Sequence, residues 1–133
     1  MAYTTALMLF GVLTLVMLSI EITMTYATQG FGFGFSSNRD PNIERPAFAL
    51  RVQRAYQNQI ESAAYGVPVL AAAAITGLQS GSAEMAALLF VVGRAAFALL
   101  YYSGVSFIRV PAFAMGTLSA LYIAYAIYES GLA

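Results

Sequence analysis

The sequence predicts an all-α protein: an integral membrane four-helix bundle in a single domain that covers residues 1–133. Of its residues, 60% are hydrophobic and only 9% are charged, whereas about a quarter of the residues in an average soluble domain carry a charge. So few charged residues cannot cover a water-facing surface. Four long stretches of largely apolar sequence alternate with short breaks, and we therefore expect four helices.

The residue types exclude several classes of protein. The net charge is zero and all six basic residues are arginines, so the chain lacks the excess positive charge that nucleic-acid binding needs. There is no cysteine and no histidine. We therefore predict no Cys/His metal site, and no Ser-His or Cys-His nucleophile pair.

The first helix is predicted over about residues 4–27. This stretch is apolar or hydroxyl-bearing apart from Glu21, and it is long enough to cross a hydrocarbon core of about 30 Å. No basic segment precedes it, and its apolar stretch is longer than that of a signal peptide. We expect it to be retained as a helix.

A break is predicted over residues 29–46. Glycines and phenylalanines alternate over residues 30–35, and a proline stands at position 41, a pattern that disfavours a helix. Two interpretations of the three phenylalanines stay open. They are aromatic anchors at the membrane interface, or they belong to a flexible hydrophobic loop.

The second helix is predicted over about residues 46–78, the third over 83–103 and the fourth over 110–128. The second is polar in its first half and rich in alanine in its second half. At roughly 30 residues it would be about 45 Å long, which exceeds the bilayer core. The two later turns are short, so neighbouring helices should pack antiparallel.

The arginines predict the orientation of the chain. Arg39 and Arg45 lie in the first loop and Arg109 in the third, whereas the second loop has no arginine. The positive-inside rule places loops one and three in the cytoplasm and both termini on the opposite side.

The second helix carries a polar face. At about 100° per residue, the side chains of five residues fall within a sector of roughly 80°: Arg51, Arg54, Asn58, Glu61 and Tyr65. This narrow sector, referred to below as the polar face, suits a small anionic or zwitterionic ligand, because arginine binds carboxylates with bidentate geometry. The alternative is that these groups satisfy one another and hold the helices together.

The third helix contributes Arg94 and, seven residues later, Tyr101 on the same side. A charged residue within a span is costly unless it faces the bundle and finds a partner. We expect Glu61 to pair with Arg94 or with Arg54, and Arg109 to lie near the same end of the bundle.

The polar face resembles the signature of the MAPEG family, the membrane-associated proteins in eicosanoid and glutathione metabolism, in a bacterial-type member. That signature is an Arg-x-x-Arg-Ala-x-x-Asn-x-x-Glu run on the second helix, and each fixed position is met here by Arg51, Arg54, Ala55, Asn58 and Glu61. Gly93 and Arg94, with Tyr101 and Arg109, also resemble the third and fourth helices of the family.

The resemblance implies a multi-pass protein of the bacterial inner membrane that assembles as a homotrimer with twelve helices. Glutathione, a co-substrate, would bind between neighbouring subunits at the cytoplasmic half. The implied glutathione-binding residues are Arg51, Arg54, Asn58, Glu61, Arg94 and Tyr101. The implied catalytic residue is Arg109, whose guanidinium would stabilise the glutathione thiolate and lower the pKa of its thiol.

The implied function is that of a glutathione-dependent transferase or peroxidase. Its substrates would be lipophilic electrophiles or hydroperoxides that enter from the membrane lipid. Two positions depart from the family pattern: Ser62 follows Glu61 where some enzymatic members have tyrosine, and Phe97 stands where active members often have tyrosine or histidine. The alternative is a non-catalytic lipid-binding protein or an accessory subunit of a membrane complex. An ion channel or transporter is less favoured, because the polar residues cluster at one end of the spans.

Overall fold

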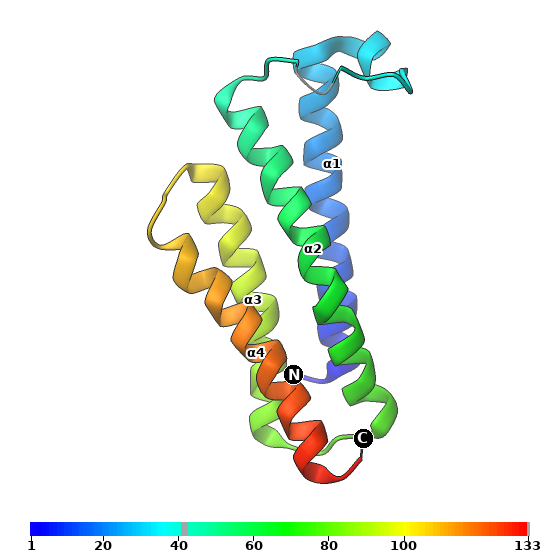
Figure 1. Ribbon diagram of the computed structural model, residues 1–133, viewed down its shortest axis with the longest axis vertical. Coiled ribbons are helices and arrows are strands. Elements are labelled where there is room, and N and C mark those ends of the chain that lie inside the picture. Colours follow the sequence, from blue (N-terminus) through cyan, green and yellow to red (C-terminus); the bar gives the residue numbers. More distant parts are fainter. Residues whose placement is uncertain (41–42, 133) are drawn as a thin grey trace.

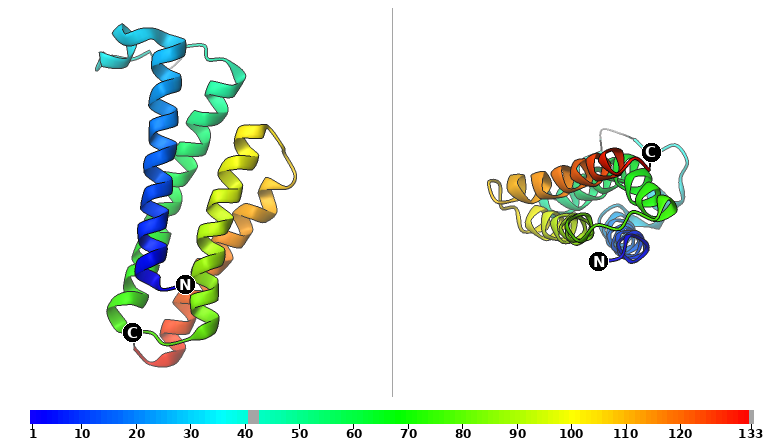
Figure 2. Two further views of the ribbon diagram at one scale, coloured as in Figure 1. Left: turned by 180° about the vertical axis from the view of Figure 1, so that it is seen from behind. Right: turned by 90° about the horizontal axis from the view of Figure 1, so that it is seen from below.

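The computed structural model describes residues 1–40 and 43–132 and has the predicted all-α architecture. Its elements are α1 (Tyr3–Phe35), α2 (Ala47–Thr76), α3 (Gly81–Ser103) and α4 (Arg109–Ser130). α1 runs beside α2, and α3 runs beside α4 (Figures 1 and 2). The prediction of a four-helix bundle is confirmed.

Three of the helices, α1, α3 and α4, are long and apolar enough to cross a membrane. α2 has the length, with 30 residues, but its polar first half lowers its mean hydropathy. Both termini lie at one end of the bundle, whereas the α1–α2 loop and the α3–α4 turn lie toward the other (Figure 1). The loop that holds Arg39 and Arg45 therefore lies toward the same end of the molecule as Arg109, which the structure places at the start of α4 and not in the predicted third loop.

The first helix is longer than predicted. α1 continues through the glycine-phenylalanine stretch to Phe35, interrupted at Gly30, whose φ of 81° and ψ of 168° are not helical. Glycine adopts this backbone conformation at little cost. Beyond Gly30 the chain turns across the end of the bundle as a short helical segment (Figure 1).

Ring packing explains why this segment is helical despite its glycines. The ring of Tyr26 lies 5.1 Å from that of Phe31 and 5.7 Å from that of Phe35, centroid to centroid. Such ring contacts stabilise a compact turn by more than the burial of the apolar ring surface alone would. The predicted break is therefore a sharp bend at Gly30 followed by a turn of helix, and the loop proper begins at Ser36. The predicted residues 41–42 of this break lie outside the described residues.

The remaining helix ends lie within two residues of the prediction, and that of α3 at Ser103 matches it. Local chemistry sets these ends. α2 ends at Thr76, where Gly77 takes a left-handed conformation and the N–H of Leu78 donates to the carbonyl of Ala73, a common way to end a helix. α3 begins at Gly81, because the hydroxyl of Ser80 accepts from the N–H of Ala83, which caps the free donors of the first turn.

α3 and α4 approach each other closely at Gly93. A Cβ atom built there would lie 3.0 Å from the backbone nitrogen of Gly116 and 3.1 Å from the carbonyl oxygen of Ala112. Small residues at such crossings let membrane helices pack backbone to backbone. This contact joins the two helices near the depth at which Arg94 enters the bundle.

Candidate functional site

Arg94 is the centre of the polar region inside the bundle. It extends from α3 and is fully buried, with 0% of its surface exposed. Gly116 of α4 leaves room for its stem, since a Cβ there would lie 3.2 Å from Cδ of Arg94. Gly93 and Gly116 therefore have two roles. They allow the close contact between α3 and α4, and they leave room for the Arg94 side chain.

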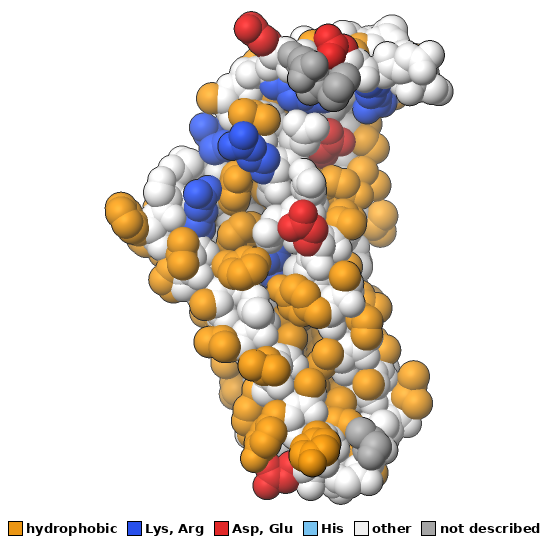
Figure 3. Space-filling model, viewed as in Figure 1, with side chains coloured by type: hydrophobic (Ala, Val, Ile, Leu, Met, Phe, Trp, Pro, Cys, Tyr) orange, Lys and Arg blue, Asp and Glu red, His pale blue; other side chains and the backbone are white. Residues whose placement is uncertain are grey.

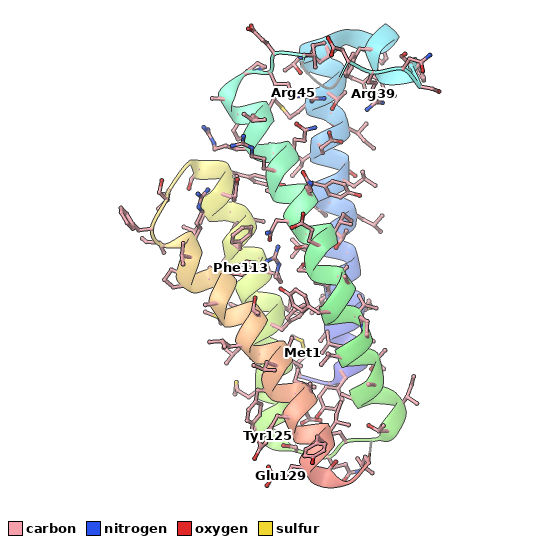
Figure 4. The ribbon with its side chains drawn as sticks, viewed as in Figure 1. Met1, Arg39, Arg45, Phe113, Tyr125 and Glu129 are labelled. Carbon is pink, nitrogen blue, oxygen red and sulfur yellow. The ribbon has the colours of Figure 1, made fainter. Side chains whose placement is uncertain are left out.

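The partners of Arg94 are two amides of α2. Its Nη2 donates to Oδ1 of Asn58 at 2.7 Å, and its Nε donates to Oε1 of Gln59 at 3.1 Å. The guanidinium carbon lies 4.7 Å from the ring centroid of Phe97 and 6.0 Å from that of Phe113, within the range of cation–π attraction. Phe113 faces this region from α4 (Figure 4). Within residues 1–40 and 43–132, the Nη1 atom of Arg94 has no hydrogen-bond partner.

The prediction that Arg94 faces the bundle is confirmed, but the expected pairing with Glu61 is wrong. Glu61 is exposed and makes no hydrogen bond or ion pair to any residue that the structure describes. Asn58 and Gln59 turn toward α3, whereas Glu61 lies further round α2. The angular offset of about 60° between Asn58 and Glu61 on an ideal helix separates the two side chains.

Gln59 belongs to this region and was missed by the sequence interpretation. It is fully buried, and while its oxygen accepts from Arg94, its Nε2 donates to the hydroxyl of Thr14 on α1 at 3.0 Å. Gln59 therefore links three helices. Its spacing from Ala55 and Ser62, which are both buried, places it on the inner face of α2 and could have revealed it.

The polar face divides in the folded protein. Asn58 points inward to Arg94, and the hydroxyl of Tyr65 lies 3.3 Å from that of Thr117 on α4. Arg54 and Glu61 instead lie exposed on the outer side of α2. The structure therefore does not bring all five side chains onto one open surface, because their 80° sector spans the boundary between bundle and exterior.

A second group of cationic side chains lies nearer the α3–α4 turn. Nε of Arg51 donates to the backbone carbonyl of Tyr102 at 3.1 Å, and its guanidinium carbon lies 5.6 Å from the ring centroid of Phe48. These contacts tie the start of α2 to the end of α3. The side chain of Arg51 also lies beside Gly104, 3.6 Å from the position of a Cβ there.

Arg109 and Tyr101 come together, whereas the sequence interpretation placed Arg109 only near the same end of the bundle. The guanidinium carbon of Arg109, the first residue of α4, lies 4.6 Å from the ring centroid of Tyr101 near the end of α3. The ring of Tyr101 in turn lies 5.5 Å from that of Phe97. Stacking on an aromatic face holds an arginine side chain in position.

The charge distribution follows from these positions. On the face shown in Figure 3, basic side chains gather in the half that holds the α3–α4 turn, with acidic side chains among them, and hydrophobic side chains cover most of the half nearer the termini. An anionic ligand would be attracted to the first half.

The comparisons with known proteins identify a family. The model of the MAPEG family matches residues 3–128, which is nearly the whole chain. No curated protein and no solved structure matches this chain.

Proposed function

Because the chain belongs to the MAPEG family, a family of membrane proteins, we propose that it is a glutathione-dependent membrane transferase or peroxidase. Its substrates are lipophilic electrophiles or hydroperoxides. The proposal rests above all on the hydrogen bond from Arg94 to the side-chain oxygen of Asn58. The remaining contacts of the polar face give it further support.

The bond to Arg94 determines what Asn58 can offer a ligand. Since the amide oxygen of Asn58 accepts from a buried guanidinium, its NH₂ group is left as the donor. With the exposed cation of Arg54 and the carboxylate of Glu61, α2 then presents two donor groups and one acceptor. Glutathione has two carboxylates and one ammonium group, so the two donor groups and the one acceptor are complementary to it.

Arg109 is the group that would act on the sulfur. Its guanidinium would stabilise the glutathione thiolate, and the thiolate would form a carbon–sulfur bond with the electrophile while the leaving group departs. Holding the thiolate beside a fixed cation, away from water, is an electrostatic and positional contribution to catalysis. Tyr101 supports this role by fixing the Arg109 side chain.

The homotrimer is part of the proposal. Arg54 and Glu61 are exposed on α2 in the single chain, and a charged side chain that faces lipid is costly. A neighbouring copy packed against α2 would cover them and would complete a glutathione site between subunits. We also place loops one and three in the cytoplasm of a bacterial cell, from the position of their arginines.

A non-catalytic lipid-binding or accessory protein is the second candidate, and two contacts favour it. Ser62 is buried and donates its hydroxyl to the carbonyl of Gln59. Phe97 is buried between Arg94 and the ring of Phe113. Neither position supplies a hydroxyl to a bound thiol.

Glutathione binding to detergent-purified protein tests the proposal. We expect Arg54→Ala to weaken binding about tenfold or more, because a charge-assisted hydrogen bond contributes about 1.5–3 kcal/mol. Arg39→Ala is the matched control, since it removes the same charge from a loop outside the polar face and should leave the affinity unchanged. Absence of millimolar glutathione affinity in the unaltered protein would favour the second candidate.

A further inference from the structure

A polar pocket lies on the α1–α2 side of the molecule, apart from the residues assigned to glutathione. It has a volume of about 630 Å³, is open to the outside and is lined by α1, the loop after it and the start of α2. The residues of its wall that the argument uses are Glu21, Phe33, Arg39, Asp40, Glu44 and Arg45. Neither Arg54, Asn58 nor Glu61 lines it.

Two arginines define the basic side of this pocket. Their guanidinium carbons lie 5.4 Å (Arg39) and 5.8 Å (Arg45) from the ring centroid of Phe33. Arg39 also donates to the backbone carbonyl of Gly34, and Nη1 of Arg45 donates to the hydroxyl of Thr25 at 3.4 Å. Both cations are thus held at one place at the loop end of α1, as Figure 4 shows.

Carboxylates also line the pocket. Oε1 of Glu21 accepts from the hydroxyl of Thr25 at 3.1 Å, so a chain of hydrogen bonds joins Glu21 to Arg45. Asp40 and Glu44 line the same space, and both residues are exposed. A ligand with only negative charge would be repelled by these carboxylates, whereas one with a phosphate and an ammonium group would match both the arginines and the carboxylates.

The surroundings of the pocket favour a lipid headgroup as this ligand over a free small molecule. The bend at Gly30 carries Phe31 and Phe35 across the end of α1, where they are 69% and 78% exposed. Their rings lie 6.3 Å apart and form one aromatic surface. Aromatic rings prefer the headgroup level of a bilayer, so this surface would set the pocket at the depth of the lipid headgroups.

We propose that this pocket binds a zwitterionic phospholipid headgroup of the phosphoethanolamine type. The phosphate is bound by Arg39 and Arg45, and the ammonium group donates to Glu21 and Glu44. A primary ammonium can donate three hydrogen bonds, whereas the quaternary ammonium of a phosphocholine headgroup has none to donate. The pocket should therefore select phosphatidylethanolamine over phosphatidylcholine and over phosphatidylglycerol, which has no cation.

Native mass spectrometry of protein released from detergent micelles, with the three lipids at equal concentration, tests the selection. The unaltered protein should retain phosphatidylethanolamine at least several-fold better than the other two lipids. The double variant Arg39→Gln/Arg45→Gln should retain about tenfold less phosphatidylethanolamine than the unaltered protein. Arg54→Gln, the matched arginine control, should retain as much as the unaltered protein. Equal retention of the three lipids, or an unaffected double variant, would overturn the proposal.

The exposed Glu44 provides a variant that leaves the helices undisturbed. Glu44→Gln should reduce the preference for phosphatidylethanolamine over phosphatidylcholine while leaving the retention of phosphatidylcholine unchanged. Unchanged discrimination would contradict the assigned role of the carboxylates, even if the double arginine variant failed to fold.

Two soluble competitors test whether the bound molecule is a lipid or a free small molecule with similar charged groups. Phosphoethanolamine without acyl chains should displace the lipid only at far higher concentration, and displacement at equal concentration would overturn the lipid assignment. Reduced glutathione should not displace it at all. Displacement of the lipid by glutathione would assign the pocket to the proposed enzyme function and overturn the lipid proposal. If the protein bound no glutathione at all, the proposed enzyme function would fail but the lipid proposal would stand.

Discussion

At the scale of single residues, Arg94 differs from the other arginines in being a fully buried cation with amide partners. Two charge-assisted hydrogen bonds and two aromatic rings offset part of the cost of its desolvation. This arrangement fixes the side chains of Asn58 and Gln59 on α2. Arg94 is therefore a positioning residue for Asn58, and its burial argues against direct contact with a ligand.

Replacing Arg94 with lysine should separate the effect of Arg94 on the position of Asn58 from the effect of its positive charge. Lysine keeps the charge but cannot hold two amide oxygens in the fixed fork of a guanidinium, so we expect Arg94→Lys to weaken glutathione binding about tenfold. A double-mutant cycle with Asn58→Ala, measured by calorimetric titration, checks the mechanism. The lysine effect should disappear in the Asn58→Ala background, and two additive effects would show that Arg94 does not act through Asn58.

Arg109 is expected to affect the rate more than the affinity. Arg109→Ala should lower the conjugation of a model electrophile about 100-fold, the scale seen when one group that stabilises an anion is removed. The onset of activity should also move to higher pH, since the thiol would lose a cation that favours its ionised form.

Tyr101 provides the structural control for that measurement. The contact with Arg109 is made by the ring face, so Tyr101→Phe should retain activity and Tyr101→Ala should not. Activity unchanged by Arg109→Ala would end the thiolate role assigned to this residue.

At the scale of the helices, α3 and α4 depend on contact between their backbones. A Cβ at residue 93 would meet backbone atoms of α4 at 3.0 and 3.1 Å, and backbone cannot move aside as a flexible side chain can. The contact lies directly beside Arg94, so any separation of α3 from α4 would also disturb the positioning of Asn58.

We expect Gly93→Ala to destabilise the fold by about 1–3 kcal/mol, the usual cost of overpacking. Thermal unfolding in detergent, followed by circular dichroism, checks this. Gly11→Ala on α1 is the control, because a Cβ there meets no atom within 4 Å, and it should leave the unfolding temperature unchanged or raise it slightly. Equal effects of the two substitutions would contradict a close α3–α4 contact.

At the scale of the whole molecule, the exposed charges of α2 require an explanation. Three helices present apolar surfaces suited to lipid, whereas α2 exposes Arg54, Gln57 and Glu61. Packing of α2 against neighbouring copies would shield these groups from the hydrocarbon region. The proposed trimer and the proposed glutathione site would then share this helix.

The oligomeric mass in mild detergent tests the trimer. Light scattering coupled to size-exclusion chromatography should give three chains of 14.2 kDa after correction for bound detergent. Glu61→Leu should retain the fold and the trimer but lose glutathione binding, since it removes only the carboxylate. A monomeric protein that still binds glutathione would refute a site between subunits.

The sequence alone determined much about this protein. The shortage of charge predicts a membrane protein, and the spacing of apolar stretches and turns predicts four antiparallel helices. The register of Arg51, Arg54, Asn58 and Glu61 carries the family resemblance, and the family match agrees with it. These features are readable because the bilayer and the helical repeat impose strong, local and periodic demands on residue type.

The tertiary structure decided what a single helix cannot encode. Only the packing of α2 against α3 showed that Arg94 binds Asn58 and Gln59 instead of Glu61, because partner choice depends on how two helices rotate about their axes. The contacts of Tyr26 with Phe31 and Phe35 likewise outweighed the disfavoured glycines of the first loop. Local propensity could not reveal that turn of helix, since the stabilising ring lies on the far side of the bend.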